Sequence, residues 1–164
     1  MIVMVRLDER MIHGQVAIKW ARHTSADRII VANDEAAGND IVQKSLMMAA
    51  PPTCKTVIKS VQQAVELLKD PRCKPLKIFV IVSRPEDLLT LTREIPDIPL
   101  INFGNYGRIA PKQSGKQRKE YGINLYAYPE EVEVFVQILA SGIECIYQTT
   151  PEHTPEPLKR VLGL

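Results

Sequence analysis

The sequence has few cysteines and no long hydrophobic run, and both absences narrow the class of protein. The three cysteines, Cys54, Cys73 and Cys145, form an odd and sparse set, which argues against a disulfide framework and for a reducing compartment. No apolar stretch approaches the roughly 20 residues of a membrane span. Residues 1–6 read as the start of a buried strand and not as a leader peptide. We therefore expect a soluble protein of the cytoplasm.

The chain also has little net charge and few aromatic residues. The chain carries 21 Lys and Arg against 19 Asp and Glu, and only 5% of its residues are aromatic. A nucleic-acid-binding surface usually clusters basic residues among aromatic ones, so we predict no nucleic-acid partner. The one basic cluster is interpreted as a solvated loop, with a surface for an anionic partner as the alternative; it contains Lys112, Lys116, Arg118 and Lys119.

Several motifs that carry chemistry in other proteins are missing. No glycine-rich nucleotide loop follows an expected strand. A Cys-x5-Arg phosphoryl loop needs Arg six residues after Cys, but Ser60, Phe79 and Pro151 stand at those positions. His23 and His153 share no metal-ligand spacing with the cysteines, and we interpret both as solvated or helix-end residues. The sequence predicts no metal and no cofactor.

What the sequence does contain is an alternation of short apolar runs with segments of helical period. With 45% apolar residues in 164, residues 1–164 can form one domain with a real core. The expected fold class is α/β, a mostly parallel sheet with helices on both faces. Residues 103–117 are expected to be a loop that can contain a hairpin, and residues 149–157 an exposed connector before a short helix. Strands are expected at 2–7, 28–32, 56–59, 76–82, 99–102, 123–126 and 143–148, and helices at 14–24, 36–50, 61–69, 85–93 and 130–141.

Residues 8–15, which read DERMIHGQ, follow the first strand and lead into a helix. The carboxyl ends of parallel strands are where such sheets bind ligands, and a helix start offers free N–H groups to an anion. Gly14 lets the backbone approach a tetrahedral group, and the guanidinium of Arg10 matches phosphate oxygens. Asp8 can hold Arg10 or an imidazole N–H. A neutral imidazole such as that of His13 is a competent nucleophile toward phosphorus.

Plainer interpretations of these residues remain. A histidine at a strand–helix junction can be a simple polar loop residue, and Asp8 with Arg10 can be a surface ion pair of little energetic value. Trp20 can be a stacking platform, although core packing of an amphipathic helix is the favoured interpretation.

A resemblance to a known protein family favours the functional interpretation of these residues over the plainer ones. Residues 5–16, VRLDERMIHGQV, followed by Trp20, resemble the R-I-D-x-R-L-I-H-G-Q-V signature of the mannose/fructose/sorbose-type enzyme IIB subunits of bacterial sugar phosphotransferase systems. Residues 30–36 are similar to the next family block, which usually has two acids where Asn33 and Asp34 stand. Residues 49–51 match its A-A-P, and residues 101–105 its N-x-G block, where Val or Ile usually occupies the position of Phe103. The resemblance covers nearly the whole chain but leaves the sugar open.

The resemblance implies a role for most of these residues. In this family the histidine, here His13, carries a phosphoryl group on Nδ1, taken from the phosphohistidine of a IIA domain and passed to a sugar held by the membrane subunits IIC and IID. Such a protein is a phosphohistidine–sugar phosphotransferase, cytoplasmic and attached peripherally to the membrane through IIC and IID; a homo-oligomer is left open. The implied phosphoryl-binding residues are Arg10, Gly14 and Gln15, and the supporting residues are Asp8, Arg6, Asp34 and Asn102.

Two other functions stand beside this one. A histidine-dependent phosphatase would use the same chemistry, but such enzymes have Arg-His-Gly, and Ile12 stands in the place of that Arg. A sugar or nucleotide sensor on the same sheet would not need His13. A carrier must present His13 to two partners, so we predict a shallow site with Met11 and Ile12 as partly exposed contacts, although burial of Ile12 is the default for an apolar residue.

Overall fold

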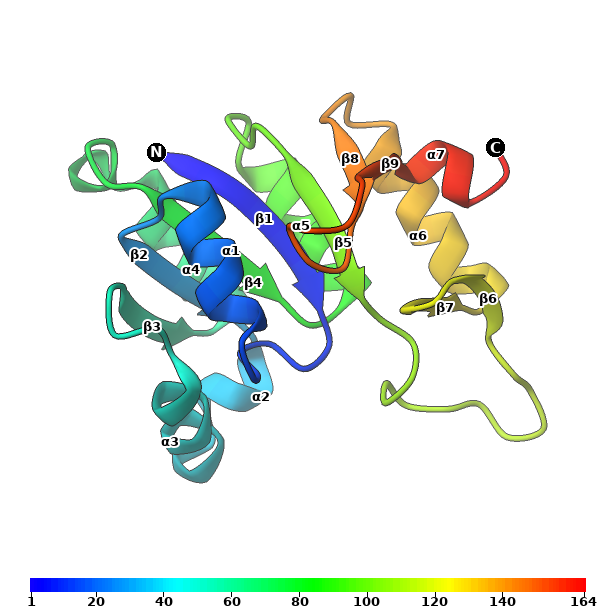
Figure 1. Ribbon diagram of the computed structural model, residues 1–164, viewed down its shortest axis with the longest axis horizontal. Helices are drawn as coiled ribbons and strands as arrows, with labels where there is room; N and C mark the ends of the chain where they lie inside the picture. The colour runs from blue at the N-terminus through cyan, green and yellow to red at the C-terminus, as the bar shows by residue number, and fades with distance from the viewer.

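The β-branched runs of the sequence build one central sheet. In the computed structural model, which describes all 164 residues, seven strands lie in the order β3-β2-β4-β1-β5-β8-β9 (Figure 1). All neighbouring strands are parallel except the final pair, β8 and β9. This confirms the predicted fold class. The strands are β1 Ile2–Asp8, β2 Arg28–Ala32, β3 Lys55–Lys59, β4 Ile78–Val82, β5 Ile101–Asn105, β8 Cys145–Tyr147 and β9 Glu156–Pro157.

Helices cover both faces of the sheet because the central strands are apolar on both sides. Helix α1 (Val16–Thr24) packs on one face, and α4 (Val61–Lys69), α5 (Pro85–Glu94) and α6 (Pro129–Leu139) pack on the other (Figure 1). Successive residues of a strand enter opposite cores. Met4 therefore packs with Trp20 of α1, and Val5 with the larger cluster that contains Phe135 of α6.

One predicted helix was wrong. In place of one helix at 36–50, the structure has two, α2 (Asp34–Ala37) and α3 (Asp40–Ala49). Gly38 and Asn39 separate them, and the Asn39 side chain accepts hydrogen bonds from two N–H groups at the start of α3. An asparagine N-cap begins a new helix where the sequence pattern indicates continuation.

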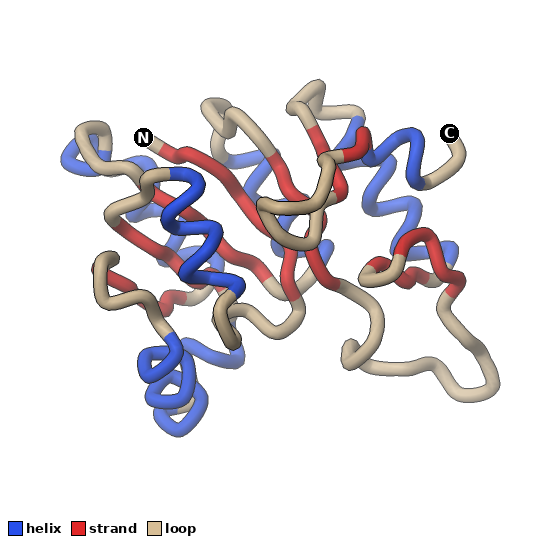
Figure 2. The backbone as a smooth tube through the Cα atoms, in the orientation of Figure 1, coloured by secondary structure: helices blue, strands red, loops and turns tan.

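The chain after β5 differs most from expectation. The predicted loop begins as strand, because β5 extends to Asn105, and the hairpin follows the loop as β6 (Lys119–Gly122) and β7 (Leu125–Ala127). Figure 2 shows the long loop that joins β5 to this hairpin. The hairpin forms its own two-stranded sheet. The predicted connector ends in β9, which pairs with β8 and leads into the short helix α7 (Leu158–Val161). Elsewhere in the chain, between α4 and β4, η1 (Pro71–Cys73) is a short 3-10 helix.

Strands β1, β2, β4 and β5 end along one edge of the sheet. From that edge the chain leaves β1 toward α1 on one face, and leaves β4 toward α5 on the other (Figure 1). Such a divergence between neighbouring strands is where open α/β sheets bind ligands. The longest helix, α6, has 11 residues, and none of the helices has the length and apolar character needed to cross a bilayer.

Candidate functional site

His13 and Asp8 form the centre of the site. Asp8 is the last residue of β1 and is fully buried, and its Oδ2 lies 3.1 Å from Nε2 of His13. The carboxylate can only accept, so Nε2 carries the ring proton and the lone pair of the neutral imidazole stays on Nδ1. The His13 side chain is 15% exposed. The ring is therefore held by one nitrogen and reachable from solvent.

The loop between β1 and α1 is shaped around Asp8. The carboxylate accepts from the N–H of Arg10 at 3.0 Å, and the Asp8 carbonyl accepts from the N–H of Met11 at 2.9 Å, an Asx-type turn. Met11 and Gly14 both have left-handed backbone, with φ of 61° and 49°. A Cβ atom at position 14 would meet no atom within 4 Å apart from those of its chain neighbours, so it is the left-handed φ, and not a lack of space, that favours glycine here.

The helix start lies close to this loop, as the sequence predicted, but α1 begins at Val16 and not at Gly14. Gln15 is the N-cap residue, and its side chain makes no capping hydrogen bond. The N–H groups of His13, Gly14 and Gln15 have no backbone acceptor. These three free N–H groups belong to His13 and the two residues after it, just before the start of α1, and such a group of donors suits an anion.

Arg10 is exposed and its side chain forms no hydrogen bond or ion pair within the protein. A free guanidinium in the loop of His13 is available for an incoming group. Of the two predicted apolar contacts, Met11 is half-buried, whereas Ile12 is 4% exposed and packs in the core beneath the loop. Ile12 is thus not part of an exposed rim.

Arg6 lies beneath Asp8 and is 2% exposed. Its Nε and Nη2 donate to Oδ2 of Asp8 at 3.3 and 3.1 Å. Burial lowers the pKa of Arg6, and the neighbouring Asp8 carboxylate opposes that shift. Asn102 accepts a hydrogen bond from Arg6. The structure therefore links Arg6 and Asn102, both predicted as supporting residues, to His13 through Asp8.

Asp34, also predicted as supporting, is not brought to His13. Its carboxylate accepts from the N–H of Val61 at 2.9 Å, which ties the start of α2 to the start of α4. Its neighbour Asn33 donates to Oγ of Ser83 at 2.6 Å and caps α2. These polar residues join the ends of the strands to one another.

Glu9 is a site residue for which the sequence indicated no role. Its buried carboxylate accepts four consecutive backbone N–H groups, those of Gly107, Arg108, Ile109 and Ala110, at 3.0 to 3.2 Å. Such a concave row of N–H groups commonly holds an anion. Here the anion is Glu9, which fastens the loop after β5 to the loop of His13.

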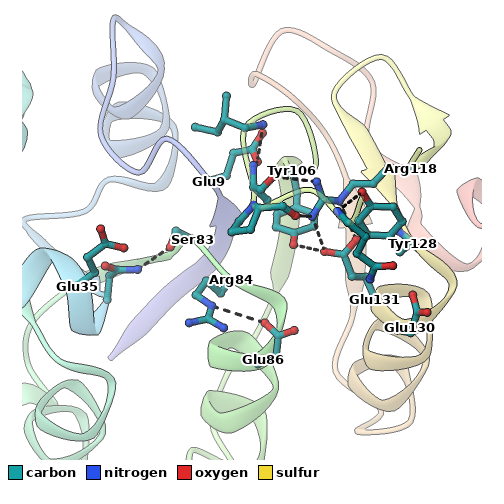
Figure 3. Close-up of a pocket in the computed structure, with 15 residues that line it drawn as sticks. Glu9, Glu35, Ser83, Arg84, Glu86, Tyr106, Arg118, Tyr128, Glu130 and Glu131 are labelled. Atoms are coloured by element: carbon teal, nitrogen blue, oxygen red, sulfur yellow. Dashed lines mark hydrogen bonds and ion pairs between the residues drawn. The ribbon is translucent and has the colours of Figure 1, made fainter. Parts of the chain in front are cut away.

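A cavity of about 510 Å³ opens beside Glu9, between the ends of β2 and β4 and the start of α6 (Figure 3). At one wall Arg118 pairs with Glu131 at 2.8 Å, and Tyr106 donates to the same carboxylate. Burial alone would raise the pKa of Glu131, but the hydrogen bonds from Arg118 and Tyr106 outweigh it and hold the pKa below its usual value. His13 does not line this cavity.

The basic cluster is only partly a solvated loop. Lys112, Lys116 and Lys119 are exposed, but the side chain of Arg118 is 6% exposed and bound to Glu131. The three cysteines are free and buried, as expected for small core residues. Burial raises the pKa of Cys145 to about 12, so this thiol is not a thiolate near neutral pH.

Comparison with known proteins agrees with the fold and with the signature. The model of the family described as "PTS system sorbose subfamily IIB component" matches residues 2–164. A Streptococcus pyogenes protein named "Probable phosphotransferase enzyme IIB component" is 34% identical over 164 residues, covering 99% of this chain and 100% of that protein. The mannose-specific EIIAB component of Escherichia coli is 28% identical over 144 residues, 87% of this chain but 42% of that longer protein.

A solved structure gives the same answer for the fold. The IIBSor domain of the sorbose permease from Klebsiella pneumoniae superimposes with a TM-score of 0.88 at 25% identity, covering 99% of this chain and 96% of that one. The family model, the full-length relative and the fold all lead to one assignment. The chain belongs to the sorbose subfamily of phosphotransferase-system IIB components.

Proposed function

We propose that the protein is a phosphoryl carrier in sugar uptake and that His13 is the residue that carries the group. Membership of the family supports a part in sugar phosphotransfer. The observation that carries the residue assignment is the contact between Nε2 of His13 and the buried Asp8 carboxylate. This contact leaves the Nδ1 lone pair on a partly exposed ring.

The reaction follows as two in-line displacements. The Nδ1 lone pair of His13 attacks the phosphorus of a phosphohistidine on a IIA domain, and the N–P bond of the donor breaks as its electron pair returns to the donor ring. A sugar hydroxyl then attacks the phosphorus, the new N–P bond breaks, and the hydroxyl proton passes to water or to a base on the membrane subunits. Positioning and charge stabilisation provide most of the catalysis in such transfers.

The groups around His13 can stabilise the negative charge of the phosphoryl group during transfer. The unpaired Arg10 guanidinium and the N–H groups of Gly14 and Gln15 can receive the equatorial oxygens of the phosphoryl group. Asp8 keeps Nε2 protonated throughout, which holds the ring in one orientation on arrival and departure. Asp8 is therefore a positioning residue, and the side chain of Gln15 has no assigned contact.

The partners follow from the same proposal. The donor is a IIA domain and the acceptor is a sugar bound by IIC and IID, so residues 1–164 would act as one IIB domain on the cytoplasmic face of the membrane. Both partners must reach His13, and the half-buried Met11 and the exposed Arg10 lie in the same loop. The subunits that bind the sugar, and not this chain, determine which sugar is phosphorylated.

Labelling tests the proposal directly. The protein is incubated with IIA phosphorylated by ³²P-phosphoenolpyruvate and the general phosphotransferase proteins, and the acid-labile label on the IIB chain is counted. We expect His13→Ala to take up no label and His153→Ala, in which an exposed histidine is removed, to take up as much as the wild type. Label on His13→Ala would overturn the assignment, and loss of the label within seconds without a sugar would indicate a phosphatase.

A further inference from the structure

Arg6 occupies a slot whose walls come from distant parts of the chain. Besides Asp8, its guanidinium donates to the side-chain oxygen of Asn102, to the carbonyl of Gln148 at 3.1 Å and to the carbonyl of Thr149 at 3.0 Å. A buried cation is tolerated only where its N–H groups are satisfied. The slot satisfies them with one carboxylate, one amide and two main-chain carbonyls.

Gly104 forms the floor of this slot. A Cβ atom at position 104 would overlap the guanidinium carbon and both terminal nitrogens of Arg6. The backbone of β5 thus approaches the arginine as closely as only glycine allows. The guanidinium has no room to move in that direction.

Trp20 closes the slot from the side of α1. Its indole N–H donates to the Thr149 carbonyl at 3.2 Å, the same carbonyl that accepts from Arg6. The Arg6 guanidinium carbon lies 5.3 Å from the centre of the indole ring, within the range of a cation–π contact. Trp20 therefore fixes both the cation and one of its acceptors.

We infer that Trp20 is a positioning residue for phosphoryl transfer, acting on His13 through Thr149, Arg6 and Asp8. The inference rests on the proposed function of His13. Each link is a hydrogen bond of 3.0 to 3.3 Å: the indole to Thr149, Thr149 to Arg6, Arg6 to Asp8, and Asp8 to His13. The chain of contacts determines where the carboxylate lies and hence which nitrogen of His13 keeps the proton.

The geometry also explains why the chain uses an indole here. Phenylalanine would preserve a ring over Arg6 but would leave the Thr149 carbonyl with one donor fewer. The turn at residues 148–153 is also held by Arg6, by the Asn102 side chain, which donates to the Gln148 carbonyl, and by the Asn124 side chain, which donates to Thr149. From α1, the other contact with the turn is the surface pair of Lys19 and Glu152 at 3.0 Å. Only the indole N–H connects the turn to the buried slot from α1.

Two variants test the inference. Trp20→Phe removes the indole donor, and Gly104→Ala forces Arg6 out of place. Phe135→Leu is the matched control, because Phe135 is a buried aromatic residue on the other face of the sheet. Ring ¹⁵N chemical shifts give the tautomer of His13, and single-turnover labelling by phospho-IIA gives the rate of uptake.

We expect Trp20→Phe to populate the Nδ1–H tautomer and to slow uptake about tenfold, and Gly104→Ala to slow it about a hundredfold, as for displacements near 1 Å. Phe135→Leu should lower the unfolding temperature without changing the tautomer or the rate. If Gly104→Ala does not fold, Trp20→Phe carries the test. The inference is overturned if Trp20→Phe keeps the wild-type tautomer and rate, or if Phe135→Leu matches its effects.

The two proposals fail in different ways. A wild-type protein that takes up no label on His13 contradicts the carrier function whatever the variants do. A wild-type protein that is labelled, with a Trp20→Phe variant indistinguishable from it, contradicts only the positioning role.

Discussion

Asp8 and Glu9 are adjacent buried carboxylates that are stabilised in opposite ways. Asp8 is held by side chains, since four of its five donors belong to Arg6, His13 and Asn105. Glu9 is held only by main-chain N–H groups, those of residues 107–110. Both arrangements satisfy a buried charge, which is costly without partners. The first arrangement places the carboxylate against the His13 ring, whose orientation and tautomer it can fix, and the second gives the carboxylate only a structural role.

The largest effect is expected from Asp8→Asn. In either orientation of the new amide, its NH₂ faces a donor, either the Arg10 N–H or the Arg6 guanidinium. We expect phosphoryl uptake to fall at least about a hundredfold because the His13 tautomer is no longer fixed, and the free energy of unfolding to fall by about 3–5 kcal/mol because Arg6 loses its partner. Uptake is measured on folded protein at low temperature. An Asp8→Asn variant with wild-type uptake would remove Asp8 from the mechanism.

Glu9→Gln should affect stability and leave chemistry intact. An amide can keep three acceptor contacts on one oxygen but then presents its NH₂ to the N–H of Arg108, so we expect a loss of about 1–3 kcal/mol. Urea unfolding gives the stability, and uptake should remain within about threefold of the wild type. Should uptake fall as far as in Asp8→Asn, the two carboxylates would not differ as described.

Asp87, a third carboxylate near this edge, sharpens the comparison because no hydrogen bond supports its charge. Burial raises the pKa of Asp87 to about 6, with Asp34 and Glu86 adding to the effect and Arg84 opposing it. Because the folded protein raises this pKa, the contribution of Asp87 to the free energy of unfolding is fully present below the unfolded pKa of about 4. That contribution is lost as the pH rises through about 6, where Asp87 becomes charged in the folded protein.

Asp87→Asn should therefore stabilise the protein by about 1 kcal/mol at pH 7.5, a figure reduced for partial solvent screening, and by almost nothing at pH 4. Thermal unfolding at the two pH values measures this difference. An equal gain at both values would show that packing, and not charge, is responsible.

Much of the fold could be predicted because the central strands β1, β2, β4 and β5 are short apolar runs. The apolar run at 28–32 and the predicted helix at 61–69 have the same bounds as β2 and α4 in the structure. The break between α2 and α3 could not be predicted from periodicity, because the Asn39 cap interrupts a pattern that otherwise continues. Where the hairpin begins could not be predicted either, because the loop of residues 106–118 before it has no periodic pattern; the structure connects the hairpin to the end of β5 through a bridge between Tyr106 and Leu125.

The candidate site, too, could be predicted only in part. The signature placed Asp8 at the end of the first strand and His13, Arg10 and Gly14 in the loop after it, and local spacing was sufficient for that. The carbonyls of Gln148 and Thr149 could not be foreseen, since every residue has a carbonyl and only the tertiary fold selects these two. The role of Glu9 was hidden for the same reason, because its partners are main-chain N–H groups.

The slot around Arg6 also has a consequence for shortened forms of the chain. The carbonyl groups of Gln148 and Thr149 follow Arg6 by 142 and 143 residues, and a domain generally folds as a unit. Without residues 148 and 149, Arg6 lacks two of the acceptors that the folded protein supplies. A chain cut before residue 148 is therefore expected to hold the Asp8 carboxylate, and with it the ring of His13, less firmly than the whole domain does.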